Sequence, residues 1–334
     1  MKVTLFYRRR LDGNYSIENI FEQVSSAFPS YLKWTKKEVS FVSNGFFKRL
    51  LIGLEAFFSR SSINHITGDI NFIALFLPAR KTILTVHDIG YMNHSSAVAR
   101  FLLLWFWIRL PLKRVAMVTA VSEATKREVL KYVSLPDHRF KVVNVPFSKR
   151  FRPASRSFNK VSPTILQIGT KHNKNVMRLI EALKGIPCQL EIVGRLTEEM
   201  KHALTLNQIS YRFSFDLSDD EIQKKYEDCD IVSFVSTYEG FGIPILEANA
   251  VGRAVITGNI LSMPEVAGNA ACLVDPYDVN DIRQGIIRLI NDDDYRNQLI
   301  ENGFVNKNRF SLEKIAEEYV NIYKSVYASR KHGN

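Results

Sequence analysis

Short runs of apolar, β-branched residues recur along the whole chain and alternate with helical patterns. Apolar residues fall at helical spacing over Ile17–Phe28 and Ser122–Tyr132, for example. Strands that alternate with helices predict right-handed βαβ units, and therefore parallel sheets covered by helices. We thus expect an α/β protein with doubly wound sheets. The expected strands are Lys2–Phe6, Glu38–Val42, Ile63–Ile66, Thr82–Val86, Met117–Val121, Val142–Val145, Thr164–Ile168, Gln189–Val193, Ile231–Val235, Ala254–Thr257 and Ala271–Val274.

A polar, basic stretch bracketed by prolines divides this pattern into two halves. Ser148–Lys160 is the best candidate for a linker, and 334 residues suit two domains better than one core. We expect one domain over 1–155 and a second over 156–310. The remaining residues, 311–334, contain a predicted helix whose apolar stripe needs a surface to pack on. That stripe comprises Ile315, Tyr319, Ile322 and Val326.

Several classes of protein do not fit the sequence. Its cysteines, Cys188, Cys229 and Cys272, lack the CxxC spacing of thiolate zinc sites and are too few for a disulfide framework. No uncharged apolar run reaches the roughly 18 residues of a transmembrane helix. Basic residues at Arg8–Arg10 interrupt the apolar core that a secretory signal would need. We therefore expect a cytoplasmic protein with reduced cysteines.

The positive charge of the chain is concentrated in its first half. Residues 1–150 contain 23 Lys and Arg against 10 Asp and Glu, a net of +13, and the remainder carries −2. Such asymmetry suggests an acidic partner for the first half: nucleic acid, an anionic membrane surface or a phosphorylated substrate. The alternative is a solvated basic surface that aids solubility.

Glycines, hydroxyl groups and charged side chains follow the predicted strands. Ligands of open parallel sheets bind beyond the carboxyl ends of the strands, so these residues indicate where a site lies. We expect them to line a cleft between the two halves that suits a phosphorylated, hydroxyl-rich ligand. The residues in question are Arg8–Arg10, Thr67–Asp69, His87–Asp88, Ser122, Gly169–Thr170, Gly194–Arg195 and Ser236–Glu239.

The segment Glu239–Ala248 is the most specific of these. Gly240 and Gly242 let the backbone approach a ligand closely, and Pro244 suits the first turn of a helix. The amino terminus of that helix favours a phosphate. Glu239 and Glu247 flank the turn and can each accept a hydrogen bond from a hydroxyl group of one extended ligand. The alternative is that Glu239 caps the helix and Glu247 forms a salt bridge.

The string Ser236–Ala248, with Gly252, Val255 and Pro264–Val266, closely resembles the retaining glycosyltransferases of family 4. This resemblance implies the GT-B fold: two Rossmann-like, doubly wound domains that face a central cleft, with a C-terminal helix that returns to the N-terminal domain. It covers most of the chain and is weakest over 10–60 and 92–112. Further matches in order are Val86–Asp88, Val121–Glu123, Ile168–Thr170, Lys174–Asn175, Val193–Gly194, Asp228–Val232 and Leu273–Pro276.

The resemblance also implies roles for residues of the second half. Glu247 is expected to hold the ribose hydroxyls of a nucleotide, and Glu239 a hydroxyl of the donor sugar. Lys174 is expected to neutralise the leaving diphosphate. The backbone around the motif is expected to meet the diphosphate or the sugar. That backbone comprises Gly240, Phe241, Gly242 and Ile243.

The phosphate-binding positions depart from the family pattern at one point. Many members have Arg directly after the glycine that is Gly169 here, where this chain has Thr170. Lys171 or Arg195 is then expected to supply the second positive charge beside the diphosphate. Gly13 occupies the first-strand loop, where the family places a glycine near the phosphates.

In the first half, the resemblance assigns His87 to the space between donor sugar and acceptor. The alternative is a core histidine at a strand end with its hydrogen bonds satisfied. Thr67 and Asp69 are candidates for contacts with the acceptor. No metal ion is expected, because Asp228 and Asp230 precede a strand, whereas carboxylates that bind a metal diphosphate lie beyond one.

The function that the resemblance implies is transfer of a sugar, with retention of its configuration, from a nucleotide diphosphate sugar to a glycan or lipid-linked acceptor, in bacterial surface polysaccharide or lipopolysaccharide synthesis. No cofactor and no nucleic acid are expected as partners. The basic first half and the apolar segments Phe46–Phe58 and Phe101–Arg109 suggest peripheral attachment to the inner face of the plasma membrane. The alternative is that both segments are core helices that cover the sheet, and for Phe101–Arg109 we favour this alternative. The alternatives are a GT-B epimerase or hydrolase of sugar nucleotides and, more remotely, a basic nucleic-acid-binding protein.

Overall fold

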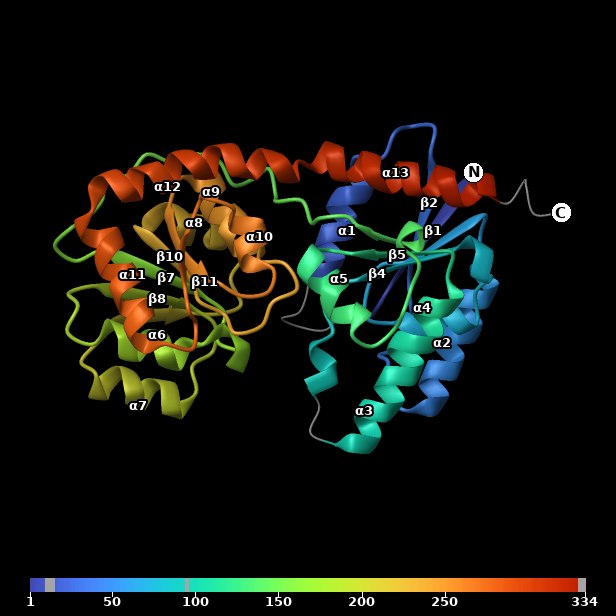
Figure 1. Cartoon of the computed structure of the whole chain (residues 1–334), viewed down its shortest axis with the longest axis horizontal. Coiled ribbons are helices and arrows are strands. Elements are labelled where there is room, and N and C mark those ends of the chain that lie inside the picture. The colour runs from blue at the N-terminus through green and yellow to red at the C-terminus, as the bar shows by residue number, and fades with distance from the viewer. Residues whose placement is uncertain (10–15, 94–95, 330–334) are drawn as a thin grey trace. The chain divides into compact units, whose positions relative to one another are not determined.

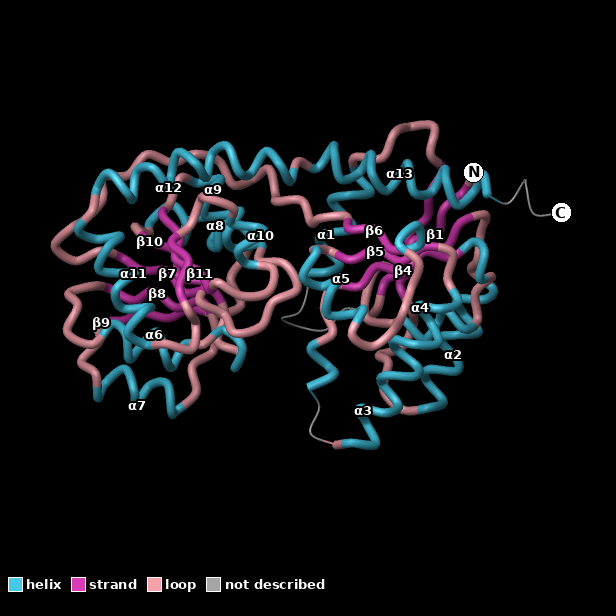
Figure 2. The backbone as a smooth tube through the Cα atoms, in the orientation of Figure 1, coloured by secondary structure: helices cyan, strands magenta, loops and turns pink. Residues whose placement is uncertain are grey.

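The computed structural model of the chain describes residues 1–9, 16–93 and 96–329 and divides into two compact units (Figure 1). Unit 1 comprises Met1–Pro146 and Leu312–Asn334, and unit 2 comprises Phe147–Ser311. Each unit contains strands with helices packed around them, as Figure 2 shows. The C-terminal helix therefore belongs to the same unit as the first strand.

Unit 1 is built on one parallel sheet, called sheet A. Its six strands in the described residues have the order β2-β1-β3-β4-β5-β6, and each neighbouring pair runs parallel. The strands are β1 (Lys2–Tyr7), β2 (Lys33–Glu38), β3 (Ile63–Ile66), β4 (Thr82–Val86), β5 (Met117–Ala120) and β6 (Phe140–Val142). The helices are α1 (Ser16–Ser26), α2 (Phe46–Phe58), α3 (Ala97–Leu103), α4 (Leu110–Arg114), α5 (Glu123–Leu130) and α13 (Leu312–Ala328). Shorter helical segments are η1 (Asn71–Leu75), η2 (Ala79–Lys81), η3 (Gly90–Asn93), η4 (Leu104–Arg109) and η5 (Asp137–Arg139).

The two faces of sheet A bury different kinds of side chain. One face is an apolar core in which Ile66, Leu84 and Val118 pack with residues of α2, η1 and η4. The other face carries a buried polar row that meets α13 and α1. There His65 bonds Thr85 at 2.7 Å and the Tyr323 hydroxyl at 2.8 Å. Because hydrogen bonds are directional, they restrict the position of α13 on the sheet more than apolar packing alone would.

Unit 2 repeats the architecture in sheet B, whose described strands have the order β12-β11-β10-β7-β8-β9 and are all parallel. The strands are β7 (Thr164–Ile168), β8 (Gln189–Val193), β9 (Ser210–Ser214), β10 (Ile231–Phe234), β11 (Ala254–Gly258) and β12 (Cys272–Val274). The helices are α6 (Val176–Leu183), α7 (Glu198–Leu206), α8 (Asp219–Asp228), α9 (Ile243–Val251), α10 (Met263–Ala267), α11 (Val279–Asn291) and α12 (Asp293–Asn306). Two short segments, η6 (His172–Lys174) and η7 (Lys307–Phe310), complete it.

Most of the expected elements are confirmed, and the differences lie at the edges of the sheets. The expected strand Glu38–Val42 is wrong, because the second strand is Lys33–Glu38. This strand pairs only with β1 and is almost wholly exposed, so its sequence is hydrophilic and lacks an apolar run. The last strand of sheet A ends at Val142, earlier than the expected Val145. The exposed edge strand β9 was not expected at all, for the same reason as β2.

The linker candidate Ser148–Lys160 carries neither helix nor strand. It is tied to sheet B by Asp230, whose carboxylate accepts both Arg156 Nε at 2.9 Å and the Thr164 amide at 2.8 Å. Asp228 ends α8, as its place before a strand predicted. None of the helices within the described residues has both the length and the apolar character required to cross a membrane.

Candidate active site

The predicted site residues fall into two groups, one on each unit, and both groups follow the carboxyl ends of strands. In unit 2 hydrogen bonds join the loop after β7 to the loop after β10. The Thr237 amide donates to the Asn173 carbonyl at 2.8 Å, and the Asn173 side chain donates to the Tyr238 carbonyl at 2.9 Å. These bonds place η6 of the first loop against the Glu239–Gly242 turn of the second.

Lys174 and Glu239 form an ion pair at this junction. Lys174 Nζ lies 2.7 Å from Glu239 Oε1, which also accepts Asn173 Nδ2 at 3.2 Å. The ammonium lies over the Phe234 ring, 4.7 Å from its centroid. Both side chains keep less than a fifth of their surface exposed. The structure therefore brings together Lys174 and Glu239, which the sequence analysis expected to bind the diphosphate and the sugar of the same donor.

Close packing explains the glycine at the end of β7. Gly169 has a φ of +87°, and a Cβ there would lie 3.2 Å from the Lys174 side chain. The neighbouring loop after β8 is equally tight, because a Cβ on Gly194 would lie 2.8 Å from Thr170. Thr170 Oγ1 donates to the Arg195 carbonyl at 2.8 Å. Thr170 thus joins two loops at the position where the family pattern has Arg.

The two candidates for the second positive charge differ in their surroundings. The Arg195 guanidinium pairs with Asp216 and lies over the Phe215 ring, 4.2 Å from its centroid. Its charge is therefore directed toward Asp216 in this structure. Lys171 lies directly before η6 and is exposed, in the same loop as Lys174.

Hydrogen bonds with the Ser262 side chain fix the turn that precedes α9. Ser262 Oγ bonds to two carbonyls of the turn, that of Glu239 at 3.0 Å and that of Phe241 at 2.7 Å. Gly242 has a φ of +121°, which an L side chain rarely adopts, and precedes the first helical residue, Ile243. Among the side chains that the structure describes, none caps this amino terminus. Its amide groups are therefore suited to a phosphate or a sugar oxygen.

Glu247 lies in the second turn of α9 and is held by Tyr226 of α8. The Tyr226 hydroxyl donates to Glu247 Oε2 at 2.6 Å. Burial is the largest cause that raises the pKa of Glu247, and the charges of Arg150 and Lys174 oppose it. Burial also raises the pKa of Tyr226 well above its usual value, so the phenol keeps its proton and acts as donor. The arrangement directs one carboxylate oxygen while the other remains available to hydroxyl groups.

Two further residues adjoin Glu247 that the sequence analysis did not single out. Arg150 pairs with Asp219 at the start of α8, and its Nε is buried with no hydrogen-bond partner among the described residues. Phe151 meets the Tyr226 ring edge-on, with centroids 5.2 Å apart. The basic stretch around Arg150 could be recognised in the sequence, but its approach to α8 and α9 depends on the tertiary structure.

In unit 1, His87 lies at the carboxyl end of β4 and is buried. Its Nε2 lies 2.8 Å from the Thr67 carbonyl, so Nε2 carries the proton and Nδ1 holds a lone pair. Burial lowers the pKa of His87. A neutral imidazole with its tautomer fixed in this way can accept a hydrogen bond from a ligand hydroxyl. The Thr67 side chain itself is turned inward and donates to the Phe6 carbonyl at 2.8 Å.

Asp69 belongs to a charged cluster at the same edge of sheet A. Arg8, directly after β1, donates to Asp69 at 2.8 Å and to the buried Glu18 at 2.6 Å. Arg8 thereby links the strand end to α1 and to the loop after β3. Sequence reasoning listed Arg8 among the strand-end residues but gave it no role. The predicted phosphate-loop residue Gly13 lies outside the described residues.

Asp230 of the Asp-Cys-Asp string has a structural role, because Arg156 and backbone amides occupy its carboxylate. Across residues 1–9, 16–93 and 96–329, no group of three or more His, Cys, Asp or Glu side chains is arranged to hold a metal ion.

Comparison with known proteins relates the chain to glycosyltransferases. Residues 148–305 match the family described as glycosyl transferases group 1. O-antigen chain mannosyltransferase B of Escherichia coli is 25% identical over 283 residues, which cover 75% of this chain and 72% of that protein. The serotype-specific mannosyltransferase WbdA of the same organism is 26% identical over 232 residues, 61% of this chain but 28% of WbdA.

The whole chain also has a structural counterpart. HepE of Anabaena, solved in complex with UDP and glucose, superposes with a TM-score of 0.78 at 15% identity. The superposition covers 97% of this chain and 100% of HepE, so the expected fold is confirmed. The chain is a glycosyltransferase with the GT-B fold, and its residues 148–305 are similar to the family described as glycosyl transferases group 1.

Proposed function

We propose that the chain is a retaining glycosyltransferase like those of family 4, which moves a hexose from a nucleotide diphosphate sugar to a glycan or lipid-linked acceptor. The observation that carries this proposal is the Lys174–Glu239 pair beside the uncapped amino terminus of α9. An ammonium and free amides suit a diphosphate, and a carboxylate suits sugar hydroxyls. The three groups meet at one edge of the group 1 domain.

Each residue of this edge then has a role. Glu247 accepts hydrogen bonds from the ribose hydroxyls, and Tyr226 positions its carboxylate. Lys174 and the amides near Gly242 stabilise the charge that develops on the leaving diphosphate, which is the main catalytic task of such a site. Glu239 holds the donor sugar once the diphosphate has drawn Lys174 away from it. His87 and Asp69 serve the acceptor side, whereas the buried Thr67 side chain, which donates to the Phe6 carbonyl, positions the strand end.

The reaction needs no protein nucleophile. As the bond from the anomeric carbon to the diphosphate oxygen breaks, the acceptor hydroxyl oxygen bonds to that carbon on the same face. The hydroxyl proton passes to the departing phosphate oxygen, so charge and atoms balance. With Lys174 and helix amides in place of a cation, we propose that transfer requires neither a metal ion nor another cofactor.

The sugar and the setting follow from the relatives. Two of them are mannosyltransferases by name, one of O-antigen chains, so we propose mannose as the transferred sugar and surface polysaccharide as the product. The alignment spans less than a third of WbdA, so this assignment concerns the matched part alone.

Calorimetry with UDP, GDP, ADP and their sugars tests the donor site, with Glu247→Ala as the variant and Glu301→Ala, an exposed glutamate of α12, as its control. We expect micromolar binding of one nucleotide, weakened about tenfold or more by Glu247→Ala and unchanged by Glu301→Ala. If the folded protein binds none of them, the donor-site assignment is wrong.

Turnover of the nucleotide sugar separates the transferase from the alternative enzymes. A transferase consumes the donor only when an acceptor is present, and NMR of the product gives the anomeric configuration. Turnover without acceptor would instead indicate an epimerase or hydrolase.

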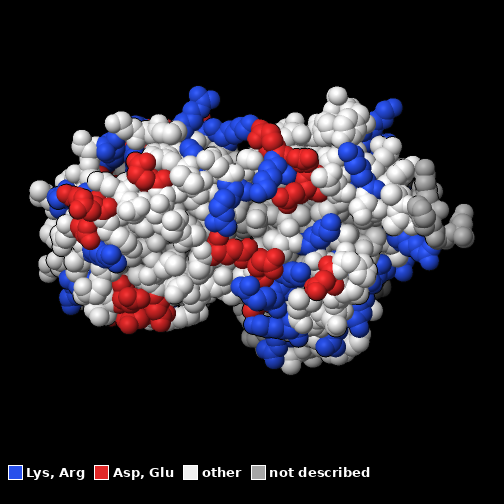
Figure 3. All heavy atoms as spheres, turned by 45° about the horizontal axis from the view of Figure 1, so that its top comes forward, with Lys and Arg blue, Asp and Glu red and all other residues white. Residues whose placement is uncertain are grey.

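We further propose that unit 1 works at the inner, anionic face of the plasma membrane. Helix α2 exposes Phe46, Phe47 and Phe58 by 75%, 78% and 79%, although its other side is buried in the core. Such a patch of large apolar side chains usually marks an interaction surface. Lys48 and Arg49 lie on the same helix, and Figure 3 shows Lys and Arg gathered over the lowest part of unit 1.

Co-sedimentation with vesicles that contain phosphatidylglycerol tests this attachment. Phe47→Ser with Phe58→Ser should reduce binding about tenfold or more, because each ring buries apolar surface in the bilayer. Leu206→Ser with Val305→Ser removes equally exposed apolar residues from unit 2 and should leave binding unchanged. Equal binding by both double variants would contradict the proposal.

A further inference from the structure

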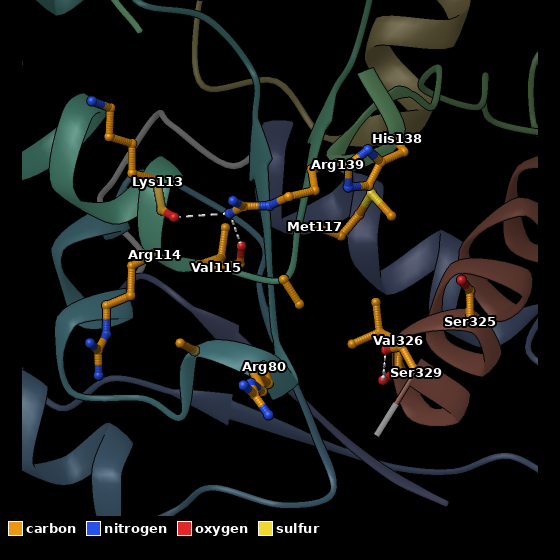
Figure 4. A pocket seen from close by; sticks show the side chains of 12 residues that line it. Arg80, Lys113, Arg114, Val115, Met117, His138, Arg139, Ser325, Val326 and Ser329 are labelled. Carbon is orange, nitrogen blue, oxygen red and sulfur yellow. Dashed lines mark hydrogen bonds between the residues drawn. The ribbon is translucent and has the colours of Figure 1, made fainter. Parts of the chain in front are cut away.

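Unit 1 has a concave surface at the edge of sheet A where the strands begin. Its volume is about 520 Å³, which is ample for a small organic ligand. The lining comes from segments that lead into neighbouring strands: Ala79–Arg80 before β4, Lys113–Ala116 before β5 and His138–Arg139 before β6. Ser325 and Val326 of α13, with Ser329 directly after it, close the opposite side (Figure 4). Strands in a parallel sheet share one direction, so this pocket lies at the edge opposite to His87 and Asp69.

The charge of this pocket is entirely positive. Its twelve lining residues include three Arg, one Lys and one His but neither Asp nor Glu. None of these basic side chains forms an ion pair with another described residue. Basic residues elsewhere in unit 1 commonly have acidic partners, as in Lys37–Glu55 and Lys36–Glu22. Unpaired like charges around one hollow repel each other, and an anion between them relieves that repulsion.

Two of the guanidinium groups are held in place by the backbone. Arg114 Nε donates to the Ala74 carbonyl at 3.1 Å, and Arg139 Nη2 donates to the Lys113 carbonyl at 2.9 Å. These bonds reduce the conformational entropy that the side chains would lose on binding a ligand. Arg80 and His138 are exposed and have no hydrogen bond of their own within the described part of the chain. The pocket therefore combines preorganised cations with adaptable ones.

We propose that this pocket binds an organic phosphate. Guanidinium groups match phosphate oxygens in bidentate geometry, and the Ser325 hydroxyl is a further donor. The Ser329 hydroxyl donates to the Val326 carbonyl at 3.1 Å. Val115, Met117 and Val326 give the pocket an apolar wall against which the carbon part of the ligand packs. A phosphate ester can come from a lipid headgroup or from a free metabolite, and the pocket chemistry suits both. The site is distinct from the donor site, which lies in unit 2.

Calorimetry with two soluble probes tests the proposal and distinguishes the sources. The probes are glycerol 3-phosphate and dihexanoyl phosphatidylglycerol below its micelle concentration. We expect at least one to bind with a dissociation constant below about 1 mM. If the lipid binds at least tenfold more tightly than glycerol 3-phosphate, the natural ligand is a lipid headgroup. If glycerol 3-phosphate binds as tightly as the lipid or more tightly, the natural ligand is a free phosphate ester. Amide NMR shifts at Ser325 and Ser329 should locate either probe.

The variant Arg80→Gln with His138→Gln removes two side chains that make no structural hydrogen bonds, so the fold should be retained. We expect it to weaken binding tenfold or more. The control, Lys2→Gln with Lys33→Gln, removes two exposed lysines from β1 and β2 and should change affinity less than twofold. The proposal is overturned if neither probe binds the wild type, if the pocket variant binds as the wild type does, or if sulfate binds as tightly as the phosphate esters.

Discussion

At the residue scale, Glu247 makes nucleotide binding depend on pH. Burial raises the pKa of its carboxyl group above 4.5, so the carboxylate takes up a proton at a higher pH than an exposed glutamate does. The charged form accepts hydrogen bonds from hydroxyl groups more strongly than the protonated form does. Nucleotide affinity should therefore fall as the pH is lowered through this raised pKa. Calorimetry at a series of decreasing pH values measures the fall, and Glu247→Gln should bind weakly with a flat profile.

Lys174 should affect the chemical step more than the binding of the donor. Lys174→Gln removes the cation that faces the leaving diphosphate but keeps the length of the side chain. Loss of one such group costs about 2.7–4 kcal/mol in the barrier, so kcat should drop between about a hundredfold and a thousandfold. Lys184→Gln, at an exposed position after α6, is the control. A normal kcat with a raised KM would assign Lys174 to binding alone.

The residues of this site were predictable to different degrees. Glu239, Glu247 and Lys174 were predictable because they lie in segments whose glycines and residue spacing match the pattern of family 4 glycosyltransferases. Tyr226 and Arg150 were not, because their roles arise only when α8 and the linker pack beside α9. A tyrosine within a helical pattern has no feature in the sequence that distinguishes a core residue from a partner of a carboxylate.

At the element scale, a buried hydrogen bond between Tyr323 and His65 helps to hold α13 on sheet A. Tyr323→Phe removes the hydroxyl that meets His65 at 2.8 Å and leaves a buried ring nitrogen without a partner. We expect the free energy of unfolding to fall by about 1–3 kcal/mol. Urea denaturation measures this change. Tyr327→Phe on the same helix removes a hydroxyl with no such bond and should change the free energy little.

The burial of His65 makes unit 1 sensitive to acid. Burial lowers the pKa of His65 from 6.5 to about 3, so the folded state holds this ring neutral. The unfolded chain takes up a proton below about pH 6.5, and the folded protein does not. Stability should therefore decline as the pH falls from 6.5 toward 3, by up to about 1.4 kcal/mol per unit. A pH series of urea midpoints tests this, and a profile unchanged from pH 7 to 4 would contradict it.

Elements were predictable where burial imposes a pattern. Strands covered by helices on both faces, such as β4 and β10, are continuous apolar runs and were predicted within a residue. The edge strands β2 and β9 form because their backbones pair with a neighbour, and solvent covers most of their side chains. Because their side chains are mostly exposed, their sequences lack the periodic apolar residues from which a strand is predicted.

At the scale of the whole molecule, the two units should differ in their need for the C-terminal helix. A chain that ends at Ser311 lacks α13, whose buried Tyr319 and Tyr323 belong to unit 1. We expect unit 1 of this variant to lose its cooperative unfolding transition, whereas unit 2 keeps its own. Limited proteolysis should then degrade residues 1–146 and leave 147–311 intact. Equal protection of both parts would show that α13 is dispensable for unit 1.

The assignment of α13 to unit 1 also sets the order in which the chain can fold on the ribosome. The first 146 residues emerge early but wait for residues 312–328, because those residues cover the His65 face of sheet A. All of unit 2 is synthesised in between, which takes roughly ten to thirty seconds at usual rates of translation. Unit 2, although second in the sequence, can thus be the first to finish, and the polar face of sheet A stays open to chaperones during that interval.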